Sequence, residues 1–112
     1  MSKISFEDIG AVVATCQAAE GVTGGQVVKL TGNGKVGPCA AGDKFCGVAL
    51  EPRCAIVGVQ FKGFMTVNYS GSLTPGWATL AADGSGGVKS ASGGVSALVV
   101  SAESDGTAVI CL

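Results

Sequence analysis

The sequence has no histidine, and only 13% of its 112 residues are charged, about half the roughly 25% typical of soluble domains. Without histidine, a serine or cysteine nucleophile lacks its commonest general base. No Gly-x-Ser-x-Gly elbow occurs, and carboxylates cluster only as Glu7-Asp8 and as Glu103 with Asp105, both in expected turns or termini. We therefore predict that the protein is not an enzyme and holds no cofactor or metal.

Strong charge of either sign and long apolar runs are also lacking. Seven basic and eight acidic residues give a net charge of −1, which excludes a binder that neutralises nucleic-acid phosphates. No run of 18 apolar residues is present, so no membrane-spanning helix is expected. The surface must then consist largely of Gly, Ser, Thr and Ala, which suits a protein that packs against neighbours.

The five cysteines are odd in number and form no Cys-x-x-Cys pair. The first residues lack the continuous apolar segment of a signal peptide, so we expect synthesis in a reducing cytoplasm. A disulfide framework or a four-thiolate zinc site is the alternative, and zinc would have no histidine ligand. We predict reduced, mostly buried thiols at Cys16, Cys39, Cys46, Cys54 and Cys111.

The 19 glycines and other turn residues divide the chain into short runs rich in Val, Ile, Leu, Thr and Phe. Such regular punctuation predicts an all-β fold, a small barrel or sandwich, with no helix after residue 21. Strands are expected at residues 26–31, 45–50, 55–61, 64–69, 77–81, 96–101 and 107–112.

Residues 9–19 fit two descriptions. Ile9, Val12, Val13, Cys16 and Ala19 recur at helical spacing, and residues 5–8 resemble a capping box. The glycine and β-branched residues in the same stretch fit a buried strand equally well. The residue pattern leaves helix and strand open.

Segments of the first half recur about 50 residues later. Residues 25–30 with Asn33-Gly34 resemble residues 76–80 with Asp83-Gly84, and Val48-Ala49-Leu50 resembles Leu98-Val99-Val100. Residues 55–59 resemble residues 107–111. The echo predicts two similar β units with pseudo-twofold character.

Two motifs have both a purely structural and a functional interpretation. Gly32-Asn33-Gly34-Lys35-Val36-Gly37 satisfies the dinucleotide pattern, but no helix can open after it because Pro38 follows, so we predict a type I′ hairpin turn. Lys62 lies beside Phe61 and near Met65, which suggests the hairpin lysine of a lipoyl-like carrier domain. An exposed strand lysine is the simpler interpretation. A non-catalytic binding or carrier module is therefore the alternative function.

Trp77 is the only tryptophan. On a strand over residues 77–81 it shares a face with Thr79, opposite the more apolar Ala78 and Leu80. This parity favours an outward Trp77 at an interface. A core tryptophan at a barrel end is the competing interpretation.

Six segments follow one another in a recognisable order: residues 18–28, 45–50, 57–64, 73–76, 83–84 and 94–95. This order resembles that of the small capsid decoration, or cement, proteins of tailed bacteriophages. The resemblance spans roughly residues 10–112 and favours the strand interpretation of residues 10–16. It implies a structural virion protein, a β-barrel that binds the outer surface of the capsid shell.

The resemblance implies a single β-barrel domain over residues 10–112 and also the partners. Residues 1–9 contain no motif of the family, and we expect them to form an N-terminal arm whose role is open. The expected partners are the major capsid protein and further copies of the chain, as a trimer. Ile4, Phe6 and Ile9 in the arm, together with Trp77, are the candidate capsid or subunit contacts.

Overall fold

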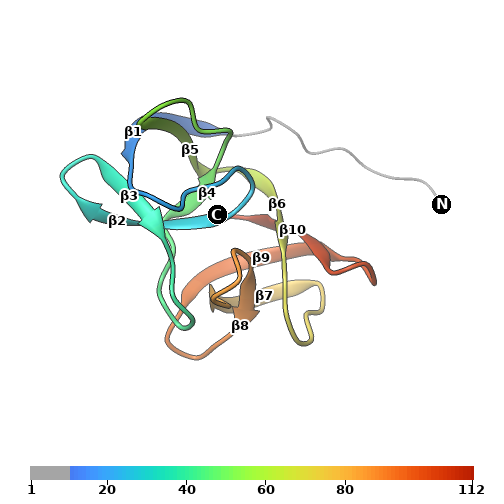
Figure 1. Cartoon of the computed structure of the whole chain (residues 1–112). Helices are drawn as coiled ribbons and strands as arrows, with labels where there is room; N and C mark the ends of the chain where they lie inside the picture. Colours follow the sequence, from blue (N-terminus) through green and yellow to red (C-terminus); the bar gives the residue numbers. More distant parts are fainter. Residues whose placement is uncertain (1–10) are drawn as a thin grey trace.

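The computed structural model describes residues 11–112, which form ten β-strands and no helix (Figure 1). The strands are β1 (Val12–Ala18), β2 (Val27–Gly32), β3 (Lys35–Pro38), β4 (Gly47–Ala49), β5 (Ile56–Lys62), β6 (Phe64–Asn68), β7 (Gly76–Ala82), β8 (Val88–Ser90), β9 (Val95–Ala102) and β10 (Thr107–Cys111).

The strands form two sheets of five. The first half of the chain makes a closed barrel in the order β1-β3-β2-β4-β5, and the second half makes a sheet in the order β6-β10-β9-β7-β8. Figure 1 shows the barrel strands in blue to green and the second sheet in yellow to red. The predicted fold class, an all-β barrel or sandwich with two similar units, is confirmed.

The second sheet repeats the pairing of the barrel strand for strand. Read around the barrel from β1, the order β1-β5-β4-β2-β3 matches β6-β10-β9-β7-β8. The barrel closes because β1 pairs in parallel with β3. In the second unit the equivalent closure is reduced to one parallel bridge, between Tyr69 and Val88. Each unit therefore forms its own sheet, one closed and one nearly open.

The register corrects one part of the predicted repeat. Ala49 pairs with Val59 in the barrel, and its equivalent Val99 pairs with Ile110. Val59 thus corresponds to Ile110, whereas the sequence echo had aligned it with Cys111, one residue away. Since a shift of one residue moves a side chain to the opposite face of a strand, the register explains why Val59 and Ile110 are both fully buried.

The apolar interior has two parts. One fills the barrel and includes Val28, Val36, Val57 and Val59. The other lines the inner face of the second sheet, and the barrel contributes Val27, Phe45 and Val48 to it. Barrel residues that point away from their own interior therefore cover the open second unit.

Backbone hydrogen bonds strengthen this junction. Val27 N donates to Gly86 O at 3.0 Å, and Ala82 N donates to Asp43 O at 2.9 Å. The two units share a core and also a hydrogen-bonded seam.

All seven predicted strands are present, with ends shifted by up to two residues. Residues 12–18, which the pattern left open, form strand β1, as the resemblance favoured. Strands β3 and β8 were missed. β3 contains Gly37 and Pro38, and β8 has three residues in a Gly- and Ser-rich stretch. The intrinsic strand propensity of these two segments is weak, so β3 and β8 form because they pair with neighbouring strands.

The predicted turn at Asn33-Gly34 is present, because β2 and β3 pair on either side of it. The turn type was wrong. A type I′ turn needs positive φ at both central residues, whereas Gly34 has φ +65° and Asn33 has no positive φ. A register shift between Leu30 and Gly32 adjusts the strands instead.

Asp83 fastens the turn between β7 and β8. Its carboxylate accepts hydrogen bonds from Ser70 Oγ at 2.7 Å, Ser85 N at 2.7 Å and Gly87 N at 3.1 Å. Burial raises the pKa of Asp83, but these hydrogen bonds outweigh it and leave the pKa below its ordinary value.

We expect the stability supplied by Asp83 to depend on pH. Because the folded-state pKa lies below the unfolded value of about 3.9, this stability is complete above that value and is lost as the pH falls through the folded-state pKa. At pH 7, Asp83→Asn should cost about 1 kcal/mol, since hydrogen bonds to a charged group are partly discounted by solvent here.

Urea unfolding of both proteins between pH 7 and pH 2 tests this expectation. The difference should shrink below pH 4 and should not depend on salt, because the partners of Asp83 are uncharged. A difference that stays constant down to pH 2 would contradict the assignment.

Candidate interaction surface

Trp77 projects outward from β7, and 77% of its surface is exposed. The next residue, Ala78, faces the core of the second sheet, as strand alternation requires. The outward orientation predicted from parity is confirmed, and the alternative of a core tryptophan is wrong. Because the exposed indole of Trp77 is not part of the core, it can contact a partner without disturbing the packing of the protein.

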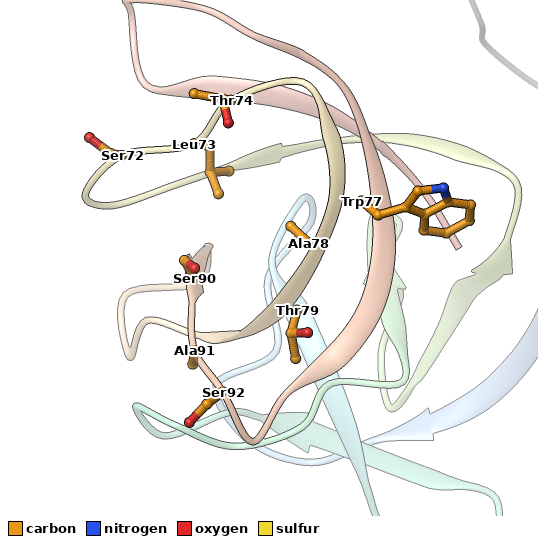
Figure 2. Close-up of a pocket in the computed structure, with 9 residues that line it drawn as sticks. All are labelled: Ser72, Leu73, Thr74, Trp77, Ala78, Thr79, Ser90, Ala91 and Ser92. Atoms are coloured by element: carbon orange, nitrogen blue, oxygen red, sulfur yellow. The ribbon is translucent and has the colours of Figure 1, made fainter.

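A depression of about 460 Å³ has Trp77 at its edge. Its other lining residues are five that bear hydroxyl groups, Ser72, Thr74, Thr79, Ser90 and Ser92, together with Leu73, Ala78 and Ala91. Figure 2 shows the indole directed away from these side chains. None of the lining residues is titratable. Their hydroxyl groups can form hydrogen bonds, but the lining contains no carboxylate, amine or thiol.

On the outer face of the second sheet, Trp77 begins a line of directly paired residues. Trp77 pairs with Leu98, Leu98 with Cys111, and Cys111 with Phe64. We call these four residues the apolar row. Leu98, Cys111 and Phe64 are partly exposed, so the row forms an uncharged band across β7, β9, β10 and β6. Sequence spacing could not reveal it, because cross-strand pairing brings its members together.

The barrel presents a second exposed apolar region, bordered by Lys62, which pairs with Val12, and by Arg53, which forms a bridge with Ile56. Residues 12–15 of β1 are all exposed, so the start of this strand is uncovered on both faces. Next to it, Leu50 and Val13 flank Gly58 of β5, and Ile56 is half-exposed. Val12, Val13, Leu50, Ile56 and Gly58 are called the barrel face below. Lys62 is the only charged residue in β1 and β5.

The other predicted contact residues, Ile4, Phe6 and Ile9, lie outside the described residues. In sequence they precede β1, which begins at Val12.

The cysteines are free thiols, but the prediction that most are buried was wrong. Cys16 is buried, Cys54 is exposed, and Cys39, Cys46 and Cys111 are partly exposed. Burial, reinforced by the charge of Asp43, raises the pKa of Cys39 to about 11. No three Cys, Asp or Glu side chains in residues 11–112 come together in a way that could hold a metal ion.

The geometry around Lys62 differs from that of a carrier lysine. Lys62 ends β5, pairs with Val12 of β1, and leads through Gly63 into the other sheet. It therefore lies in the connection between two units, whereas a carrier lysine occupies a hairpin tip. No observation favours the carrier alternative.

These features define a two-unit all-β protein with exposed apolar surfaces. Residues 11–112 include no helix that could cross a membrane. No protein-family model and no curated protein sequence matches the chain.

Proposed function

We propose that the protein is a capsid decoration protein, which binds the outer surface of an assembled phage shell and stabilises it. The main support is the barrel face, where the start of β1 is exposed on both sides although it is apolar. A strand of this kind is energetically suited to being covered by another protein, because burying apolar surface contributes about 25 cal/mol per Å².

In sequence, the segment with Ile4, Phe6 and Ile9 precedes β1, whose start belongs to the barrel face. In the proposal this segment and the barrel face meet the major capsid protein together. The low charge of β1 and β5 limits the desolvation cost that buried unpaired ions would bring.

Stabilisation follows from linkage. A subunit that bridges neighbouring capsid proteins makes contacts that exist only in the assembled shell, so its binding shifts the equilibrium away from disassembly. A shell also presents its sites in many copies, and a bridging protein gains from the resulting effective concentration. In the proposal the protein acts on the virion surface, with copies packed against one another as a trimer.

The direct test compares shells with and without the protein. Shells stripped of it should melt at a lower temperature than decorated shells, and adding the purified protein back should restore the higher value. Equal melting temperatures for bare and decorated shells would refute the proposal.

A paired substitution tests the barrel face. Ile56→Lys should weaken binding to stripped shells by about tenfold or more, since it places a charge in an apolar contact. Leu30→Lys is the control, because Leu30 is 58% exposed and lies outside the barrel face. Equal binding by the two variants would exclude this face as the contact.

A further inference from the structure

We infer that the apolar row is the surface through which the chain contacts a second copy of itself, with Trp77 of one copy packed on the row of the next. This deepens the proposed function, which includes contacts between copies but does not say where they form. The inference depends on the internal repeat, on the exposure of Trp77 and on the charge of the surrounding sheet.

The repeat shows what this face does in the first unit. Residues equivalent to the row are Val27, Val48, Gln60 and Val13, which pair in the same sequence across β2, β4, β5 and β1. Val27 and Val48 are buried because the inner face of the second sheet covers them. In the barrel, this face of the unit therefore packs against a sheet of the same architecture.

In the second unit the corresponding end of the row has no such cover within residues 11–112. Trp77 occupies the position of the fully buried Val27, yet it is 77% exposed, and Leu98 occupies the position of Val48. A residue with a large apolar ring stands where the first unit has valine, at a site that residues 11–112 leave exposed.

The composition of the face favours a like surface as the occupant. The row is uncharged, and the adjacent cross-strand pairs Thr79 with Ser96 and Val109 with Thr66 are uncharged as well. A charged partner would lose solvation here without gaining an ion pair. A second copy brings the same uncharged row, and two sheets can stack about 10 Å apart with side chains interleaved.

The dimensions allow such stacking. Four paired strands spaced about 4.8 Å apart extend the row over about 14 Å, which is enough for an indole of one copy to rest between Leu98 and Cys111 of another. Tryptophan is also the residue type most often found at the energetic centre of protein interfaces.

Sedimentation velocity of the purified protein, without shells, tests the inference. The wild-type chain should form an oligomer at high micromolar concentration. Trp77→Lys should raise the dissociation constant by about a hundredfold or more, while its circular dichroism and melting temperature stay near those of the wild type. Leu30→Lys is the matched control and should associate like the wild type.

Cys111 gives an independent readout, because it lies in the row and Cys54 lies in an exposed turn of the barrel. Alkylation of Cys111 should slow as the protein concentration rises, whereas Trp77→Lys should abolish this dependence. Cys54 reports reagent activity in the same sample. A monomeric wild-type protein, an oligomer unaffected by Trp77→Lys, or concentration-independent labelling of Cys111 would each overturn the inference. None of these results depends on shell binding, so failure here is distinct from failure of the proposed function.

Discussion

Gly94→Ala is expected to lower the free energy of unfolding by about 3 kcal/mol or more, at the upper end of overpacking effects. A methyl group on Gly94 would overlap the carbonyl oxygen of Leu80 and approach Ala81 N. These atoms belong to the backbone of β7, which pairs with β9 directly after Gly94. Relief would require the two strands to separate.

Gly93→Ala provides the control one residue earlier. Nothing lies within 4 Å of a methyl group at Gly93, and its φ is not positive. The substitution should therefore be neutral, or stabilising by about 0.4–1 kcal/mol through the unfolded state. Thermal and urea unfolding of the two variants measure the contrast, and equal stabilities would show that β9 does not approach β7 as described.

Leu80→Ala is the second substitution with a large expected effect. Leu80 is fully buried in the core shared by the two units, and truncating a buried leucine typically costs about 2–5 kcal/mol. For a domain of this size that corresponds to a fall in melting temperature of roughly 10–25 °C. Differential scanning calorimetry measures it directly.

Leu30→Ala is the comparison for Leu80. Leu30 and Leu80 end the matching segments 25–30 and 76–80 of the sequence repeat, but Leu30 is 58% exposed. Its truncation should change stability by no more than about 0.5 kcal/mol. Comparable losses in the two variants would contradict the placement of the shared core.

Leu30 and Leu80 end matching segments of the repeat, yet one is exposed and the other buried, so the repeat alone does not predict burial. The echo identified the two units and the positions of their turns, because Gly, Asn and Asp mark turns for local steric reasons. It could not fix register, because one extra residue in a strand is invisible in composition and reverses the face of every side chain beyond it.

For the candidate surface as well, the sequence predicted the local features but not those that depend on pairing between strands. Parity within one strand placed Trp77 outward, since alternation is a local property of extended chain. The apolar row was not predictable, because Leu98, Cys111 and Phe64 join Trp77 only through pairing between distant segments. The degree of cysteine burial was misjudged for a related reason, since apolar neighbours in sequence say little about which side of a sheet is covered.

The sequence by itself determined the all-β class, the approximate strands and the duplication, because these depend on turn chemistry, local propensity and short-range pattern. Only the tertiary structure decided that one unit closes and the other stays nearly open. That difference arises where β1 pairs with β3 over two residue pairs, while Tyr69 and Val88 form a single bridge. The open unit must bury its inner face, so the barrel turns Val27, Phe45 and Val48 toward it, and the matching face of the second unit is left with Trp77 exposed.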